Sequence, residues 1–303
     1  MISVIIPCFN CEDHLYRAIQ SVLNQSYQDT ELILVNNNST DNTMQLLEGY
    51  RAQFPQKISI YNELKPGAPA ARNTGLKAAH GEWIQFLDAD DELLKDKLSQ
   101  QLTRAIGNNA DVIAGGCILR YNIDGKIKEI LRHADENVWR GLITSNLGIT
   151  SSNLWRKATL TQVNGWDEAQ TSSQEYDLLF RLLKNNAKVV ADKSFSTIVH
   201  FSGNSVSKSK DSQKLKRIFD NRVNLRINIK KYLAARGRLT PTLVQTIDDY
   251  IYSEAMRMYP QIPAYARAVI RRHRPRVKWS KKFRQTGRML LKRIALQLKT
   301  HHS

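Results

Sequence analysis

The sequence has few cysteines and no long hydrophobic run. Its 303 residues include three cysteines, an odd number that does not make a disulfide framework. No run of about 18 apolar residues occurs, so we expect no membrane-spanning helix. Strand-like sequence begins at Ile2, which leaves no room for a basic and apolar signal peptide. The sequence therefore predicts a cytoplasmic protein.

Acidic residues are missing from residues 255–303, which carry fourteen Lys or Arg side chains. The formal net charge of the chain is +17, so the first 254 residues carry only +3. Basicity is thus a property of the C-terminal tail. The tail has few aromatic residues and no recognisable nucleic-acid motif, and we expect no nucleic-acid partner. Nucleic-acid binding through the tail remains the alternative function from another class.

The spacing of Cys8 and Cys11 is that of a redox pair or half of a zinc site. The only other cysteine is Cys117, and no second C-x-x-C follows. A zinc site of the usual kind needs four ligands. The favoured interpretation is two small buried or half-buried thiols.

The tail also contains apolar residues close to one face of a predicted helix: Trp279, Phe283, Leu290, Ile294 and Leu298. Lys and Arg occupy much of the remainder, which is typical of a helix that lies on anionic lipid. Pro275 and Gly287 divide the segment into two shorter helices. We predict peripheral attachment to the inner face of the cytoplasmic membrane, with a solvated charged tail as the alternative.

Strands and helices alternate in the first hundred residues. Short β-branched or apolar runs are predicted as strands at 3–7, 31–35, 58–61 and 83–87, and helices at 12–24, 41–54, 69–79 and 98–106. This alternation predicts an α/β fold whose sheet is mainly parallel and flanked by helices. A hairpin is expected from 111 to 131, a helix over 175–184, and helical, basic sequence from Asp211 onward.

Residues 84–91 lead an apolar strand directly into three carboxylates, Asp88, Asp90 and Asp91. Alternate residues of an extended segment point to the same side, so Asp88 and Asp90 can bind one cation together. Oxygen ligands of this kind suit Mg²⁺ or Mn²⁺, which complete their coordination with water and substrate phosphates. A solvated turn or a helix N-cap is the alternative interpretation.

Five segments in order resemble family 2 glycosyltransferases: residues 3–10, the turn after Val35, residues 67–81, residues 86–91 and residues 174–177. The resemblance covers roughly residues 1–207. It implies a GT-A fold, Rossmann-like, and inverting transfer of a sugar from a nucleotide donor with Mn²⁺ or Mg²⁺ as cofactor. The expected donor is a UDP-sugar, and the expected acceptor is a glycan or lipid-linked glycan of bacterial surface polysaccharide synthesis. A sugar nucleotidyltransferase of related fold is a further alternative.

The resemblance also implies a division of the chain. A catalytic domain is expected over residues 1–207, with a nucleotide-sugar half at 1–110 and an acceptor half at 111–207. Residues 208–303 would form a helical, basic C-terminal extension.

The resemblance assigns metal ligands as well. Asp90 is expected as the direct ligand, with Asp88 nearer the ribose or bound through water. Asp91 is expected to cap the following helix. His200, at the start of a loop that closes on the diphosphate in relatives, is expected as a third metal ligand or as a phosphate donor, with a structural role as the alternative.

The nucleotide pocket is expected to contain Pro7, Asn10, Asn37 and Arg72. Family members commonly carry two aspartates where this chain has Asn36 and Asn37. An amide oxygen still accepts a hydrogen bond from a uracil N–H, although without a charge. A turn chosen for its backbone tolerance is the alternative for the asparagines, and a structural ion pair is the alternative for Arg72.

An inverting displacement needs a base that takes the proton of the acceptor hydroxyl. The family's base, an acid at the start of a helix, matches Glu175. Asp177 is the rival, and it is equally suited to interact with the helix dipole. Trp166 is expected either to stack on a sugar or to belong to the core.

Overall fold

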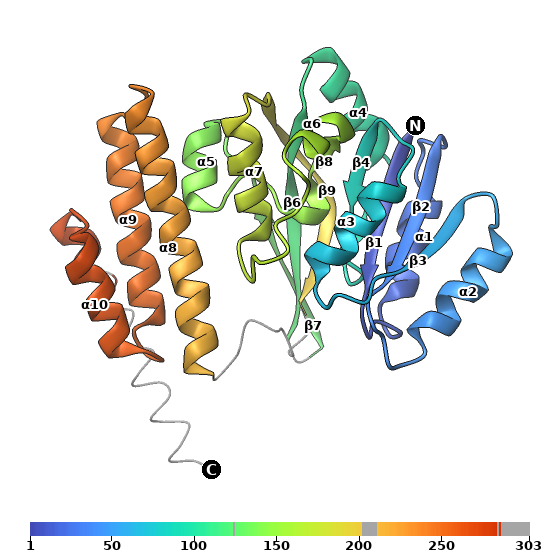
Figure 1. The fold of residues 1–303 in the computed structure, drawn as a ribbon, viewed down its shortest axis with the longest axis horizontal. Coiled ribbons are helices and arrows are strands. Elements are labelled where there is room, and N and C mark those ends of the chain that lie inside the picture. The colour runs from blue at the N-terminus through green and yellow to red at the C-terminus, as the bar shows by residue number, and fades with distance from the viewer. Residues whose placement is uncertain (124, 202–210, 284, 286–303) are drawn as a thin grey trace, which may run out of the picture. The chain divides into compact units, whose positions relative to one another are not determined.

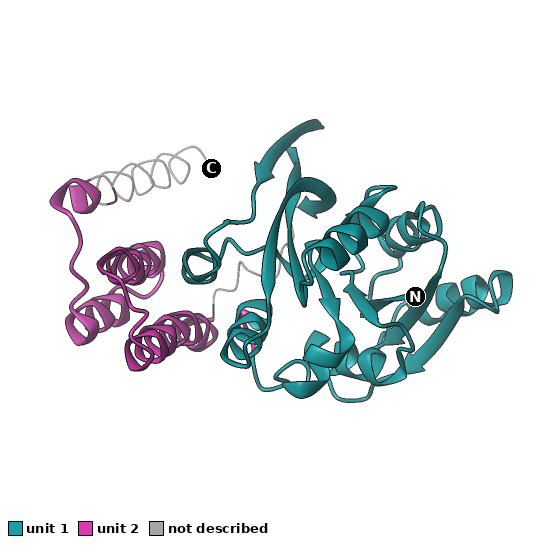
Figure 2. Ribbon diagram, turned by 90° about the horizontal axis from the view of Figure 1, so that it is seen from above, with its two compact units in different colours: residues 1–170, 174–205 teal, residues 171–173, 206–303 magenta. Residues whose placement is uncertain are grey.

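The computed structural model describes residues 1–123, 125–201, 211–283 and 285. The chain divides into two compact units, one made of residues 1–170 and 174–205 and the other of residues 171–173 and 206–303 (Figure 2). The predicted division of the first unit into a nucleotide half and an acceptor half stays a prediction.

The first unit is built on a mixed sheet (Figure 1). Its strands are β1 (Ile2–Cys8), β2 (Thr30–Asn36), β3 (Ile58–Asn62), β4 (Trp83–Phe86), β5 (Glu92–Leu93), β6 (Val112–Ile123), β7 (Lys126–Arg132), β8 (Leu154–Arg156) and β9 (Val189–Phe201). In the described residues the strand order is β3-β2-β1-β4-β8-β6-β9-β5, with β7 paired to β6. Strands β1 to β4 are mutually parallel, whereas β8 is antiparallel to both β4 and β6. The predicted mixed α/β sheet is confirmed.

Helices cover the sheet: α1 (Leu15–Leu23), α2 (Thr43–Gln53), α3 (Ala68–Ala78), α4 (Lys97–Gly107), α5 (Val138–Thr144), the 3₁₀ turn η1 (Thr150–Ser152), α6 (Lys157–Gln162) and α7 (Gln174–Lys184). Apart from Ser3, strand β1 is apolar, and its packing shows why. Val4 and Ile6 belong to the core that α1 closes with Leu15. Ile5 points to the other face, where Gly75 of α3 leaves room for its side chain. A strand covered on both faces needs apolar residues at most of its positions.

The carboxyl ends of β1, β2, β3 and β4 lie at one edge of the sheet because these strands are parallel neighbours. The loops that follow them are joined there. The side-chain oxygen of Asn10, after β1, accepts a hydrogen bond from the backbone N–H of Thr40, after β2, at 2.8 Å. The N–H of Cys11 donates to Thr43 Oγ1 at 2.9 Å. Asn10 itself has a left-handed φ of 45°, a conformation that asparagine tolerates well. This edge therefore presents polar loops in a fixed arrangement.

The second unit contains α8 (Ser212–Ala235), α9 (Pro241–Met258) and α10 (Pro263–His273). Phe219, Ile229 and Ile251 are among its buried residues. Glu254 of α9 pairs with Arg222 of α8 at 2.7 Å. Among the described residues, no helix combines the length and the hydropathy that a membrane span requires.

Candidate active site at the carboxyl edge of the sheet

The acidic segment forms a tight turn directly after β4. The backbone N–H of Asp91 donates to the carbonyl oxygen of Asp88 at 3.0 Å. Asp90 is exposed, Asp88 is half-buried, and Asp91 is only 3% exposed. The expectation that Asp91 caps a helix is wrong, because the short strand β5 follows it and α4 begins six residues later, after Asp96. Its carboxylate instead accepts a 2.5 Å hydrogen bond from Ser151.

The three carboxylates influence one another. Desolvation raises the pKa of Asp90 above its usual value, and the charge of Asp88 raises it further. The pKa of Asp91 is raised well above its usual value, first by burial and then by the charges of Asp88 and Asp90. Such a group of acids favours a bound cation, since a cation removes the repulsion.

The Asp90 side chain suits a direct metal ligand. No other residue in the part of the chain that the structure describes forms an ion pair with its carboxylate, and its carbonyl oxygen is held by Arg17 at 2.8 Å. Within the same described residues, no three His, Cys, Asp or Glu side chains are grouped as a complete metal site. Asp88 and Asp90 supply carboxylate oxygens, the donor type that hard cations prefer.

Arg72 of α3 connects the acidic turn to the start of α7. Its guanidinium lies 2.6 Å from Oδ1 of Asp88 and 3.1 Å from Oε1 of Gln174. The same group lies over the ring of Trp166, 4.6 Å from the centroid. The Arg72 side chain is only 6% exposed. The ion pair that was the alternative for this residue is thus present, and it lies within the predicted site.

Glu175 lies in the first turn of α7, next to Gln174. Burial raises the pKa of its carboxyl above the ordinary value, while Arg72 opposes this shift and the charge of Asp88 adds to it. The residue before it, Gln174, contacts Arg72 directly. A raised pKa brings a carboxylate closer to the basicity that proton abstraction near neutral pH requires.

Asp177 has a different environment from Glu175. Its carboxylate pairs with Arg181, one turn later on α7, at 2.8 Å. Arg181 in turn donates to the carbonyl oxygens of Val163 and Gly165 at 2.7 Å. Asp177 thereby fixes the loop that precedes Trp166.

Asn37 is buried, and both ends of its amide are engaged. The NH₂ group donates to the carbonyl oxygens of Glu63 and Lys65 at 2.7 and 2.8 Å, and the amide oxygen accepts from Gly67 N–H at 2.7 Å. Asn36 is half-buried, and its amide donates to Asn62 at 3.1 Å. Asn37 therefore organises the loop after β3 through its side chain, which differs from the backbone tolerance that the alternative interpretation invoked. Its predicted contact with the nucleotide base stays a prediction, as does that of Pro7, which is half-buried near the end of β1.

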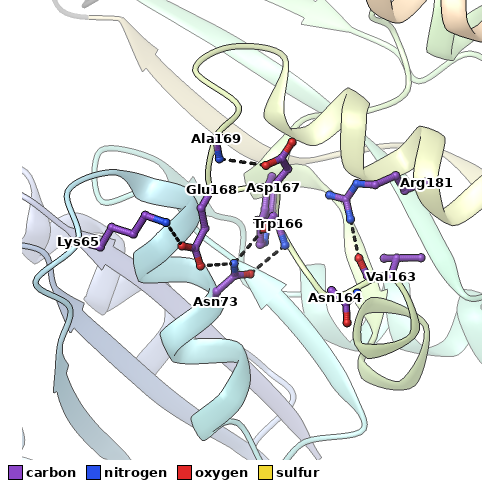
Figure 3. A pocket seen from close by; sticks show the side chains of 9 residues that line it. All are labelled: Lys65, Asn73, Val163, Asn164, Trp166, Asp167, Glu168, Ala169 and Arg181. Atoms are coloured by element: carbon purple, nitrogen blue, oxygen red, sulfur yellow. Dashed lines mark hydrogen bonds and ion pairs between the residues drawn. The ribbon is translucent and has the colours of Figure 1, made fainter.

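The Trp166 ring belongs to the core, and the alternative of a sugar-stacking surface ring is wrong. Trp166 is 2% exposed and packs edge-on against Phe86, with the ring centroids 5.1 Å apart. Its backbone is held by Asn73, whose amide oxygen accepts from Trp166 N–H at 2.8 Å. In Figure 3, Glu168 points from the same segment toward Lys65 and Asn73, with an ion pair of 2.6 Å to Lys65. These residues line a pocket of about 490 Å³.

His200, near the end of β9, does not complete a three-ligand cluster with Asp88 and Asp90. Its Nε2 lies 3.1 Å from a carboxylate oxygen of Glu92, on the neighbouring strand β5. Desolvation lowers the pKa of the imidazole. The predicted metal or phosphate role of His200 stays a prediction, and the loop after it, residues 202–210, lies outside the described residues.

Comparison with known families identifies the family of the chain. A family model described as "Glycosyl transferase family 2" matches residues 3–164, which is more than half of the chain. The chain belongs to glycosyl transferase family 2. The match includes the acidic turn and Arg72.

Two curated relatives show different extents of similarity. An uncharacterized glycosyltransferase of Haemophilus influenzae is 39% identical over 109 residues, which are 36% of this chain and 44% of that protein. The chain therefore spans less than half the length of this curated relative. The Escherichia coli UDP-Glc:alpha-D-GlcNAc-diphosphoundecaprenol beta-1,3-glucosyltransferase WfgD is 31% identical over 224 residues, 73% of this chain and 84% of that protein.

Solved structures of two glycosyltransferases show the same fold. S. aureus TarS 1–349 in complex with UDP is 18% identical, with a TM-score of 0.57 over 88% of this chain and 87% of that one. The mannosyltransferase PcManGT from Pyrobaculum calidifontis, in complex with GDP-Man and Mn²⁺, is 14% identical, with a TM-score of 0.61 over 98% of this chain and 80% of that one. The GT-A fold expected from the resemblance is confirmed.

The cysteines behave as small apolar residues in this family 2 member. Cys8 is fully buried and Cys11 is 6% exposed. Both are free thiols, and burial contributes to raising the pKa of Cys8, after the hydrogen bond it shares with Cys11. The favoured interpretation of the C-x-x-C spacing is supported.

Three residues that contact the site had not been predicted: Arg17, Ser151 and Gln174. Gln174 stands beside Glu175 in the sequence, so it could have been found from the motif. Ser151 follows Asp91 by 60 residues, and no local pattern marks it. Only the sheet, which places η1 beside β4, brings Ser151 to the acidic turn.

Proposed function

We propose that the protein is an inverting glycosyltransferase that moves a sugar from a nucleotide-sugar, by preference a UDP-sugar, to a hydroxyl of a glycan or lipid-linked glycan. One observation carries this proposal. Arg72 contacts both Asp88, a predicted cation ligand, and Gln174, the residue next to the predicted base Glu175. A single displacement needs a cation at the leaving diphosphate and a base at the acceptor hydroxyl, on opposite sides of the anomeric carbon.

Asp90 and Asp88 would hold Mn²⁺ or Mg²⁺. When bound, the cation supplies a Lewis acid that neutralises charge on the departing nucleoside diphosphate. Arg72 occupies one oxygen of Asp88 and fixes the orientation of that carboxylate. Asp90, exposed at the tip of the turn, is the more accessible ligand.

Glu175 would take the proton of the acceptor hydroxyl as the acceptor oxygen attacks. The raised pKa of its carboxyl suits this role. Asp177 has its carboxylate engaged by Arg181. We therefore assign Glu175 as the base and Asp177 as a residue that holds the preceding loop.

The loops after β1 and β2 would receive the nucleotide, with Pro7 and Asn10 beside it and Asn37 shaping the loop after β3. The fold of this chain is that of proteins whose structures contain UDP or GDP-Man. The name of WfgD specifies UDP-Glc as its donor. These similarities support a nucleotide-sugar donor, with UDP as the first nucleotide to test.

A lipid-linked acceptor fits the similarity to WfgD, whose name specifies alpha-D-GlcNAc-diphosphoundecaprenol as its acceptor. We propose a role in bacterial surface polysaccharide synthesis, carried out at the cytoplasmic face of the membrane. Trp279 and Phe283 support membrane contact. Their stacked rings are 78% and 71% exposed, and Lys278, Lys281 and Lys282 flank them. Leu290, Ile294 and Leu298, the other apolar residues of the predicted face, lie outside the described residues.

The test is a screen of nucleotide-sugars with and without Mn²⁺, followed by mass analysis of products formed on a lipid extract. We expect release of one nucleoside diphosphate, dependent on the metal, and a lipid product heavier by one sugar residue. A sugar-1-phosphate and a nucleoside triphosphate joined by the enzyme would instead support a nucleotidyltransferase. Protection of DNA or RNA at moderate salt, without sugar transfer, would support nucleic-acid binding.

A further inference from the structure

A single buried hydroxyl connects both ends of the acidic turn. Ser151 Oγ accepts a hydrogen bond from the backbone N–H of Asp88 at 3.1 Å and donates to Oδ2 of Asp91 at 2.5 Å. Ser151 is 0% exposed and Asp91 is 3% exposed. Water therefore has little access to replace the hydroxyl. These two bonds cross the turn that carries Asp90.

Ser151 is itself fixed by the strands on either side. Its carbonyl oxygen accepts from Gln85 Nε2, on β4, at 2.8 Å and from Thr197 Oγ1, on β9, at 3.3 Å. The residue lies in η1, between Gly148, which has a left-handed φ of 71°, and β8. Ser151 thus fixes the acidic turn, which has no regular secondary structure, relative to the sheet.

We infer that Ser151 is a positioning residue for the cation ligands, a role that rests on the proposed function of Asp88 and Asp90. The hydroxyl fixes the first and last residues of the turn and so determines where the carboxylates between and beside them point. Outer groups of this kind orient the ligands of a metal, and their loss typically weakens metal binding by about 10- to 100-fold. Asp91 contributes as the acceptor of the serine hydroxyl and is not itself a ligand.

The neighbouring Ser152 provides a matched control. It is also 0% exposed and lies in the same 3₁₀ turn. Its hydroxyl donates to the carbonyl oxygen of Gly115 at 2.8 Å and accepts from Ile149 N–H at 2.9 Å, so it does not contact the acidic turn. Ser152→Ala removes an equally buried hydroxyl from the same segment.

The experiment measures Mn²⁺ affinity in the presence of UDP, from the electron paramagnetic resonance signal of free Mn²⁺, for the full chain and its variants. Ser151→Ala should bind Mn²⁺ about tenfold more weakly or worse, while Ser152→Ala keeps the affinity of the wild type. Ser151→Cys preserves the volume but hydrogen-bonds weakly, and it should follow Ser151→Ala even if the alanine variant fails to fold. Thermal unfolding of each variant separates local from global effects.

Four outcomes overturn the inference. Unchanged Mn²⁺ affinity in Ser151→Ala or in Ser151→Cys would show that the hydroxyl does not position the ligands. Equal losses in the Ser151 and Ser152 variants would show a general effect of disturbing η1. A wild-type protein that binds no Mn²⁺ with UDP would overturn the proposed function as well. Binding that Asp90→Ala abolishes and Ser151→Ala preserves would overturn this inference alone.

Discussion

The guanidinium of Arg72 lies 2.6 Å from Oδ1 of Asp88, and the arginine side chain is only 6% exposed. A buried cation that loses its partner is costly, so this pair is strongly coupled. Because the same guanidinium also contacts Gln174, it connects the end of β4 with the start of α7. The pair therefore relates the position of the predicted cation ligands to that of the predicted base.

Replacing Arg72 with lysine tests this connection. Lysine keeps the positive charge but cannot contact Asp88 and Gln174 with the two arms of a planar group. We expect kcat/KM for sugar transfer to fall by roughly 100-fold, the scale associated with misplacement of about 1 Å. Arg156→Lys is the control, since Arg156 also lies over a tryptophan, Trp83, and pairs with a carboxylate, Glu82, away from the site. Equal activities of the two variants would refute the connection.

Glu175→Gln should lower kcat by about 10²- to 10⁴-fold without a comparable loss of donor binding, since it removes the proton acceptor. The direction of the pH dependence of kcat/KM follows from the role of Glu175 as a base. The base acts when ionised, so kcat/KM should fall as the pH is lowered through the pKa of Glu175, which burial raises above the ordinary 4.5. The acid limb should therefore lie at a higher pH than that of an ordinary glutamate.

Asp177→Asn separates the two candidates for the base. It weakens the hold on Arg181, so we expect a less stable protein that retains the acid limb. The pH profiles of Asp177→Asn and Glu175→Gln should be recorded under the same conditions. If the limb disappears in Asp177→Asn and persists in Glu175→Gln, the base is Asp177.

Asn37→Ala should destabilise the first unit by about 1–3 kcal/mol, because it leaves the N–H of Gly67 and two loop carbonyl groups without their partner. Urea unfolding measures this change. Asn62→Ala is the control, because Asn62 is exposed and its side chain accepts a hydrogen bond from Asn36. We expect a change within about 0.5 kcal/mol. A neutral Asn37→Ala variant would contradict the structural role of this amide.

Replacing both Trp279 and Phe283 with alanine should weaken binding to vesicles that contain anionic lipid by about tenfold or more, since two large rings no longer enter the interface. The rings are exposed, so the free energy of unfolding should stay within about 0.5 kcal/mol. Sedimentation with vesicles measures the partition. Ile106→Ala, at an apolar residue that is 65% exposed in the first unit, should have no effect. Undiminished binding by the double variant would exclude this surface.

Local patterns were sufficient for the first four strands, for the helices that follow them, and for the acidic turn. The apolar run from Ile2, the alternation of strands and helices, and the carboxylates after Phe86 are each visible within a few residues. Contacts between distant segments were not predictable in this way. Asn37 was expected to accept from a ligand, but its environment is created by a loop 26 to 30 residues later. Trp166 could be either a core or a surface ring until Phe86 and Arg72 were placed against it.

The environment of Asp91 could not be predicted from its sequence neighbours either. An aspartate after a strand and before a predicted helix has the sequence context of a cap. The pairing of Glu92 and Leu93 with β9 inserts a strand that only the tertiary structure requires, and it turns Asp91 into the interior toward Ser151.

Calorimetric measurement of UDP binding, once in the presence of Mn²⁺ and once in the presence of a chelator, most directly tests whether Asp88 and Asp90 are cation ligands. For the wild type we expect affinity at least about tenfold higher with Mn²⁺, and for Asp90→Asn equal, weak affinities in both conditions together with loss of turnover. Equal affinity of the wild type with and without the metal, and undiminished turnover by Asp90→Asn, would contradict the account.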